Sequence, residues 1–176
     1  MHITRRSLLK WTGICISGLF GYSAIVEPRN LKITKIKLNF KNLPKKINKF
    51  TILHITDLHF GSTPLKGVYD DVLKVSKEIK SDMIVVTGDT ISKRSALMYA
   101  EDFFSQLPNL PVFVVWGNWD HWSMRENIEE LKRTLEKDGK TVILSNEAYE
   151  IEENFFIFSV ACKTPCESDG IRRRGG

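Results

Sequence analysis

The body of this chain lacks a strong charge of either sign. The 176 residues carry a formal net charge of +5, but six basic residues lie near the two ends, namely Arg5, Arg6, Lys10, Arg172, Arg173 and Arg174. Without these six, the remainder of the chain is close to neutral. A general nucleic-acid binder needs a basic face to neutralise phosphates. We therefore do not expect this protein to bind nucleic acid.

The sequence also has few cysteines and no apolar run of membrane-spanning length. Of the three cysteines, only Cys162 and Cys166 lie outside the N-terminal apolar stretch, and an oxidising compartment would permit a bond between them. Hydrophobic and charged fractions of 42% and 27% are ordinary for a globular protein, which excludes a disordered chain and a membrane bundle. A chain of 176 residues is long enough for one domain with a core.

One basic stretch remains when the two ends are set aside. Between Arg29 and Lys49 there is no acidic residue, and the lysines there are Lys32, Lys35, Lys37, Lys41, Lys45, Lys46 and Lys49. One interpretation is a solvated edge strand and loop, where lysines discourage pairing with other strands. The alternative is an electrostatic contact with anionic lipid beside a membrane anchor.

Residues 1–26 have the form of an export signal. Arg5 and Arg6 precede Leu-Leu-Lys and then an uncharged stretch from Trp11 to Val26, which is short for a membrane span of about 20 residues. Adjacent arginines in this setting resemble the twin-arginine (Tat) signal. We expect the Tat translocase to export the protein to the periplasm or the outer face of the cytoplasmic membrane. Cleavage of the segment and its retention as an anchor are both open.

Strand and helix patterns alternate after residue 29. Period-two alternation predicts a half-exposed strand at 31–40, and apolar runs predict buried strands at 50–56, 83–86 and 112–116, with further strands at 141–144 and 155–160. Apolar spacing and boundary residues predict helices at 67–80, 96–107 and 123–137, the last with Ser123 and Glu126 in capping-box spacing. This alternation predicts an α/β fold with right-handed crossovers.

Each of the three buried strands is followed by a candidate metal ligand. Asp57 and His59 follow the first, Asp89 the second and Asn118 the third. In α/β sheets, ligands bind beyond the carboxyl ends of the strands. Residues i and i+2 of an extended segment project to the same side, so Asp57 and His59 can bind one ion together. Glycines at positions 61, 88 and 117 allow sharp turns there.

The order of these residues resembles that in the calcineurin-like metallophosphoesterase family. Its signature runs Asp-x-His, Gly-Asp, Gly-Asn-His-Asp/Glu, a histidine and Gly-His-x-His, and the likeness covers about residues 50–122 closely. The resemblance implies a layered α-β-β-α sandwich and hydrolysis of phosphodiesters or phosphomonoesters by a water that two divalent ions activate. It assigns Asp57 and His59 to the first ion, Asp89 to a bridge and Asn118 to the second ion. Manganese, iron and zinc all suit these ligands.

The likeness departs from the family at Trp119. The family has a histidine there, which contacts the phosphate and assists the leaving group, whereas the indole N–H of tryptophan donates a hydrogen bond but exchanges no proton near neutral pH. His121 lies two residues later and could turn toward the same cleft with Asp120 as its partner. The alternative is that the metal ions act without this acid–base assistance, which typically contributes about 10²–10⁴-fold.

The family's later histidines are absent, since the four histidines here are His2, His54, His59 and His121. The expected domain at 29–160 therefore corresponds to the N-terminal part of the family's fold, and 161–176 forms an atypical tail that a truncated or frameshifted gene would explain. Three hypotheses follow. The protein is an exported phosphoesterase that is impaired in this form, or a catalytically silent protein that binds metal, phosphate or lipid headgroups at the membrane surface, or a fragment of a decaying gene that does not fold stably. The substrate would be a phosphate ester, with lipid-linked esters and other diesters both open.

Overall fold

The computed structural model describes residues 31–41, 43–44, 47–62, 66–152, 155–160 and 172–174. The predicted export segment and both C-terminal cysteines lie outside the described residues. No helix within those ranges combines the length and the apolar character needed to cross a membrane. The chain divides into two units, one comprising Met1–Asn39 and Leu65–Val72 and the other Phe40–Pro64 and Leu73–Gly176. The sheets and the candidate site belong to the second unit.

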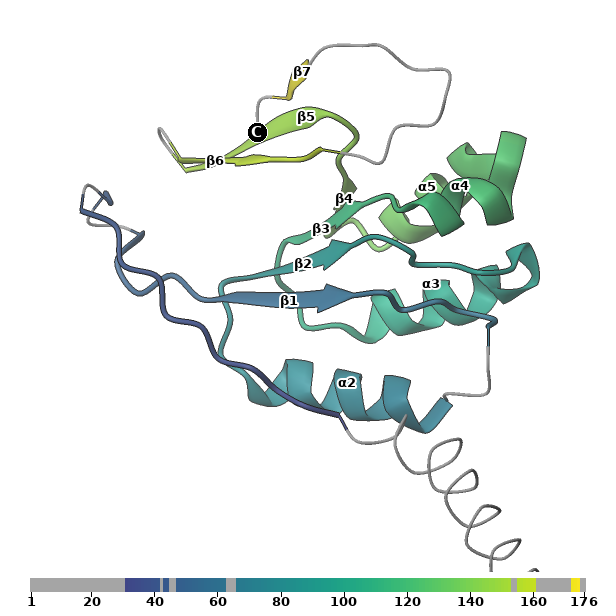
Figure 1. Ribbon diagram of the computed structural model, residues 1–176, viewed down its shortest axis with the longest axis horizontal. Coiled ribbons are helices and arrows are strands. Elements are labelled where there is room, and N and C mark those ends of the chain that lie inside the picture. Colours follow the sequence, from purple (N-terminus) through teal and green to yellow (C-terminus); the bar gives the residue numbers. More distant parts are fainter. Residues whose placement is uncertain are drawn as a thin grey trace, which may run out of the picture. The chain divides into compact units, whose positions relative to one another are not determined.

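A four-stranded parallel sheet forms the centre of the second unit (Figure 1). Its strands follow the chain in the order β1 (Ile52–Thr56), β2 (Met83–Thr87), β3 (Val112–Val115) and β4 (Thr141–Ile143). Each strand pairs in parallel with the next. The connections contain α2 (Lys66–Glu78), then η3 (Arg94–Ala96) with α3 (Leu97–Gln106), and finally α4 (Asn118–Met124), η4 (Arg125–Asn127) and α5 (Ile128–Glu136). The α/β prediction is therefore confirmed.

Side chains of the central strands alternate between two buried environments. Ile84 and Val86 of β2 are completely buried on one face, and the large side chains of α3 and α5 that are buried in the core are Phe103, Phe104, Leu131 and Leu135. On the other face, Met83 and Phe113 belong to a second apolar cluster. A strand that is buried on both faces has a continuous apolar sequence, which explains why these strands could be predicted.

A second sheet packs on that other face. Its strands are β5 (Glu147–Glu152), β6 (Phe155–Phe158) and β7 (Arg172–Arg174), in the order β6-β5-β7. Tyr149 of β5 meets Phe113 of the first sheet with ring centroids 5.1 Å apart, and Phe155 of β6 meets Phe50 at 5.6 Å. The unit thus contains helices, a parallel sheet and a mixed sheet, which account for three layers of the expected α-β-β-α sandwich among the described residues.

The strand predicted at 31–40 is wrong. These residues have no regular structure, and their apolar side chains, such as Ile36 and Leu38, are exposed. An alternating pattern becomes a strand only where a neighbouring strand satisfies its backbone groups. Within the described ranges of the chain, no strand pairs with this segment.

One predicted helix and two strands also differ from the prediction. The helix expected at 123–137 begins earlier, at Asn118, and is interrupted at Arg125, whose φ of 48° is incompatible with a continuous right-handed helix. The Ser123 hydroxyl therefore caps no helix and donates instead to the Ile91 carbonyl at 3.0 Å. Strand β5 was missed because its three glutamates weaken the apolar signal, and β7 lies within the segment expected to be an irregular tail.

Candidate metal site at the carboxyl edge of the sheet

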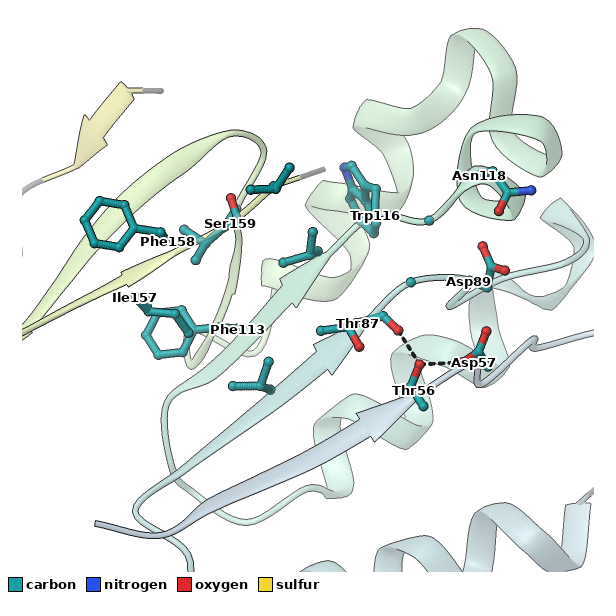
Figure 2. Close-up of a pocket in the computed structure, with 16 residues that line it drawn as sticks. Thr56, Asp57, Thr87, Asp89, Phe113, Trp116, Asn118, Ile157, Phe158 and Ser159 are labelled. Atoms are coloured by element: carbon teal, nitrogen blue, oxygen red, sulfur yellow. Dashed lines mark hydrogen bonds between the residues drawn. The ribbon is translucent and has the colours of Figure 1, made fainter. Parts of the chain in front are cut away.

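The candidate ligands gather at the carboxyl edge of the parallel sheet. Asp57 follows β1, Asp89 follows β2, and Asn118 begins α4 shortly after β3. Figure 2 shows these three side chains along the same edge. Because neighbouring parallel strands end together, residues about 30 positions apart in the sequence become neighbours in space.

Asp57, His59 and Asp89 form a group that could hold a metal ion. One ligand atom from each lies within 4.8 Å of the others. The Nε2 atom of His59 lies 4.0 Å from Oδ1 of Asp57 and 3.7 Å from Oδ2 of Asp89. Two carboxylates and an imidazole suit a divalent ion such as manganese, iron or zinc. The spacing of the donors and their chemistry therefore fit the predicted metal.

The backbone at this edge adopts conformations that are uncommon for residues other than glycine. Asp57, His59 and Asp89 have φ values of 55°, 48° and 48°. Left-handed residues outside glycine carry strain that persists where the surrounding structure holds it, and such strain clusters at functional sites. Here the hydrogen bond from His59 N–H to the Asp89 carbonyl, at 2.8 Å, joins the two ligand loops directly.

Gly117 is required by the close approach of two loops. A Cβ atom at this position would lie 2.1 Å from Oδ1 and 2.3 Å from the backbone nitrogen of Asp89. Any other residue would collide with a candidate ligand and its main chain. The glycine that precedes Asn118 is therefore explained by packing against Asp89.

The imidazole of His59 is oriented by Ser92. Its Nδ1 atom lies 2.8 Å from the Ser92 hydroxyl, which leaves Nε2 directed toward the two carboxylates. Ser92 is brought there because the pairing of the two segments resumes beyond the ligands, in a parallel bridge between Phe60 and Ile91. Such outer contacts fix the tautomer and the direction of a ligating histidine.

The two carboxylates are oriented as well. The Thr56 hydroxyl lies 2.5 Å from Oδ2 of Asp57 and 2.8 Å from the Thr87 carbonyl, contacts that Figure 2 marks with dashed lines. The backbone N–H of Trp119 donates to Oδ1 of Asp89 at 2.9 Å, and Oδ2 of the same carboxylate faces His59. Both acids therefore keep an oxygen available for an ion while the other is held by the protein.

His54 lies within β1 and forms a hydrogen bond with the side chain of Thr87. Its Nε2 atom is 2.6 Å from the Thr87 hydroxyl. His54 is therefore engaged within the sheet and does not belong to the group of clustered candidate ligands.

Asp120 occupies a different position from the other acids. It is completely buried, and its two oxygens accept hydrogen bonds of 2.8 Å from the backbone N–H groups of Ile91 and Gly117. The carboxylate thus ties the loop after β2 to the start of α4, where it fills the N3 position of the helix. Burial raises the pKa of Asp120 to about 6, although the hydrogen bonds from Gly117 and Ile91 act in the opposite direction.

His121 is half-buried on α4, next to Asp120 in the sequence. Because both oxygens of Asp120 accept backbone bonds, that carboxylate serves the loops. Pairing of His121 with Asp120, and a catalytic role for either residue, stay predictions.

A cavity of about 630 Å³ extends from the candidate ligands across the sheet. Asp57, Asp89 and Asn118 form its polar end, as Figure 2 shows. Its other walls are mainly apolar and come from β2, β3 and the second sheet, including Phe113 and Ile157. A phosphate at the polar end would therefore lie beside an apolar wall.

Sequence reasoning missed the groups that orient the ligands. Thr56 carried a local signal, since a hydroxyl directly before Asp57 can bond to its side chain. Ser92 carried none, because it reaches His59 only through the pairing of the two segments beyond the strands. Asp120 likewise carried none, because it reaches the segment after Asp89 only where α4 meets it, and there it accepts the Ile91 N–H.

The sequence is similar to a family model and to several known proteins. The family model described as calcineurin-like phosphoesterase matches residues 50–174, a range that extends into the segment expected to be an atypical tail. An uncharacterised metallophosphoesterase of Bacillus subtilis (strain 168), YkoQ, is 28% identical over 76% of this chain and 50% of its own length. The phosphodiesterase YaeI of Escherichia coli (strain K12) is 27% identical over 95% of this chain and 66% of its own length.

The chain spans between half and two thirds of the length of these two relatives. A crystal structure of the Pseudomonas putida nuclease MPE aligns with 57% of this chain and 53% of that protein, at 19% identity and a TM-score of 0.36. This structural likeness is too remote to bear on function.

Proposed function

Because this chain belongs to the calcineurin-like phosphoesterase family, we propose that it hydrolyses phosphodiesters or phosphomonoesters at the carboxyl edge of its parallel sheet. The observation that carries the proposal is the group formed by Asp57, His59 and Asp89, whose ligand atoms lie within 4.8 Å of one another. The relative named as a phosphodiesterase supports diesters as the first substrates to test.

The protein's own part in this chemistry is to place ligands before a metal arrives. Ser92 directs Nε2 of His59, and Thr56 holds one oxygen of Asp57. The Trp119 N–H holds one oxygen of Asp89, so the other can face the ion. A bound divalent ion would supply an acidified water and would neutralise charge on the phosphoryl group. Ligands that are oriented in advance lower the cost of assembling such a site.

We extend the proposal to two ions, with Asp89 between them and Asn118 beside the second. Asn118 supports this because it lines the same cavity as Asp57 and Asp89. Among the described residues, three clustered ligand groups and one amide are few for two ions, so we expect turnover by this chain to be slow. His121 remains the candidate proton donor for the leaving group.

The cellular setting belongs to the same proposal. Arg5 and Arg6 ahead of an apolar stretch support Tat export, which carries folded proteins. A substrate at the outer face of the membrane would then be accessible, and an ester linked to a lipid is one form that it could take.

The test is a comparison of the wild-type chain with Asp89→Asn. Asparagine keeps an oxygen for the Trp119 N–H but removes the charge that an ion needs. We expect the affinity for Mn²⁺, measured by calorimetry, to fall by more than about 100-fold, beyond what loss of an outer contact usually costs. Hydrolysis of bis(p-nitrophenyl) phosphate should fall with it.

Asp102→Asn is the matched control, because Asp102 is exposed on α3 and contacts Gln106 of the same helix. It should change neither quantity. Equal Mn²⁺ affinity in wild type and Asp89→Asn would contradict the site. Tight binding that depends on Asp89, without any hydrolysis, would contradict the enzymatic proposal and favour a protein that binds metal or phosphate.

A further inference from the structure

Two tryptophans stand beside the candidate metal site with much of their surface in solvent. Trp119 and Trp122, both on α4, are 42% and 63% exposed. By contrast, Phe60 and Phe113, from segments that pass close to the site, are almost completely buried. Adjacent exposed aromatic rings form the kind of apolar patch that marks a binding site when it lies beside polar functional groups.

The two indoles form a corner that an aromatic ring could enter. Their centroids are 5.6 Å apart and their planes make an angle of 65°. A planar ring can stack on the face of one indole while its edge or face meets the other, since both offset and edge-to-face arrangements of aromatic rings are favourable. An alkyl group would gain burial in the same corner but none of this ring-to-ring attraction.

The corner is continuous with the proposed metal site. The Trp119 ring lies 5.7 Å from the imidazole of His59, at an angle of 83°. The Trp119 backbone N–H also donates to Asp89, as described above. A substrate whose phosphate lies at Asp57, His59 and Asp89 could therefore place a ring on these indoles.

Helix α4, which carries both indoles, is anchored to the segment after β2. Between the two tryptophans, Asp120 is buried and bonded to Ile91 and Gly117, and Ser123 donates to the Ile91 carbonyl. Met124 is buried one turn further on. A platform ordered in advance loses little conformational entropy on binding.

We propose that Trp119 and Trp122 form a subsite for an aromatic ring carried by the phosphate-ester substrate. This inference rests on the proposed function, since the metal site would hold the phosphate end. The ring could be a nucleobase or another aryl group, and both share the flat π-face that the corner would recognise.

The experiment measures binding of two phosphonates in the presence of Mn²⁺. Benzylphosphonate and cyclohexylmethylphosphonate match in charge and nearly in size, so their affinity ratio reports on the aromatic ring. We expect the wild-type chain to prefer the benzyl compound by about fivefold. In Trp119→Leu and in Trp122→Leu the ratio should fall toward one, and Trp122→Phe should keep most of it.

Tyr99→Leu serves as the control, because it removes an exposed ring from α3 and should leave the ratio unchanged. A second pair, adenosine 5′-monophosphate and ribose 5-phosphate, distinguishes the sources of the ring. Preference for the nucleotide that is lost in the tryptophan variants assigns the corner to a nucleobase, whereas preference for the benzyl compound alone assigns it to other aryl groups.

Two results would overturn the inference, and they differ in what they say about the proposed function. Mn²⁺-dependent binding of both phosphonates with a ratio near one, or a ratio that survives in both leucine variants, rejects the aromatic subsite and leaves the metal site intact. Failure of either phosphonate to bind in a manner that depends on Mn²⁺ contradicts the proposed function, and the subsite with it.

Discussion

The loops after β1 and β2 and the helix that follows β3 place their acids and rings in opposite ways. On the loops, Asp57 and Asp89 face one another across His59 and remain accessible to an ion. On α4, Asp120 is buried while Trp119 and Trp122 are exposed. The difference shows that position relative to the backbone, more than residue type, decides which acid can bind a metal and which one serves the fold.

Backbone hydrogen bonding explains this inversion. The loop at Ile91 and the start of α4 at Gly117 would each bury an N–H group, and one carboxylate satisfies both. For Asp57 and Asp89, in contrast, these hydrogen bonds from the protein engage one of the two carboxylate oxygens. One acid is therefore used for structure, and the other two are left for a ligand.

Replacing the buried acid should have the largest effect on the free energy of unfolding. Asp120→Ala leaves two buried N–H groups without an acceptor, and each costs about 1 to 3 kcal/mol. We expect the free energy of unfolding, measured in urea, to fall by about 4 kcal/mol. Asp82→Ala is the control: Asp82 also accepts a backbone N–H, from Thr51, but is exposed, so its loss should cost less than about 1.5 kcal/mol. Similar costs for the two variants would contradict the role given to Asp120.

The dependence of the unfolding free energy on pH should show a smaller effect of the same carboxyl. Because burial raises the pKa of Asp120 from 3.8 to about 6, the folded chain binds more protons than the unfolded chain between these values. The contribution of Asp120 to stability is thus complete below pH 3.8 and is lost as the pH rises through about 6.

Asp120→Asn cannot titrate at this position and provides the reference for that series. Without metal, we expect the unfolding free energy of the wild type to decline relative to this variant by up to about 3 kcal/mol over the whole titration, at 1.36 kcal/mol per pKa unit, with about 2 kcal/mol of the decline between pH 4 and pH 6. A wild-type unfolding free energy that stays constant relative to Asp120→Asn, or that rises relative to it as the pH rises, would show that the pKa of the Asp120 carboxyl is not raised.

Removing the hydrogen bond between His59 and Ser92 should have the smallest effect. Ser92→Ala removes the hydroxyl that lies 2.8 Å from Nδ1 of His59. We expect affinity for Mn²⁺ to fall by about tenfold, at the low end of the range for such contacts, while Ser92→Thr keeps most of it. Ser105→Ala removes an exposed hydroxyl bonded to the Asp102 carbonyl and should have no effect. Unchanged affinity in Ser92→Ala would show that His59 needs no such support.

Much of the parallel sheet could be predicted because its signals are local. Strands β1, β2 and β3 are short apolar runs, and each is followed by polar residues that lie at the carboxyl edge of the sheet. The strand prediction failed where strand formation depends on pairing with another segment of the chain. Residues 31–40 alternate as a strand does but form none, and β5 is a strand despite three glutamates.

The candidate site divides in the same way. The sequence predicted that Asp57, His59, Asp89 and Asn118 lie together, because each of them follows a predicted strand within a few positions. The supporting residues were not, since Ser92 meets His59 across 33 positions and Asp120 meets Ile91 across 29.

Local sequence patterns specify which segments become buried strands, and therefore which ligand types meet at one edge, because apolar runs and strand-end residues act over a few positions. The environment of each group around that edge follows from long-range packing: Asp120 is buried, Trp119 and Trp122 are exposed, and His59 is oriented by Ser92. Burial, and the pKa that follows from it, depend on what the rest of the chain packs against a residue, and that packing joins segments far apart in the sequence.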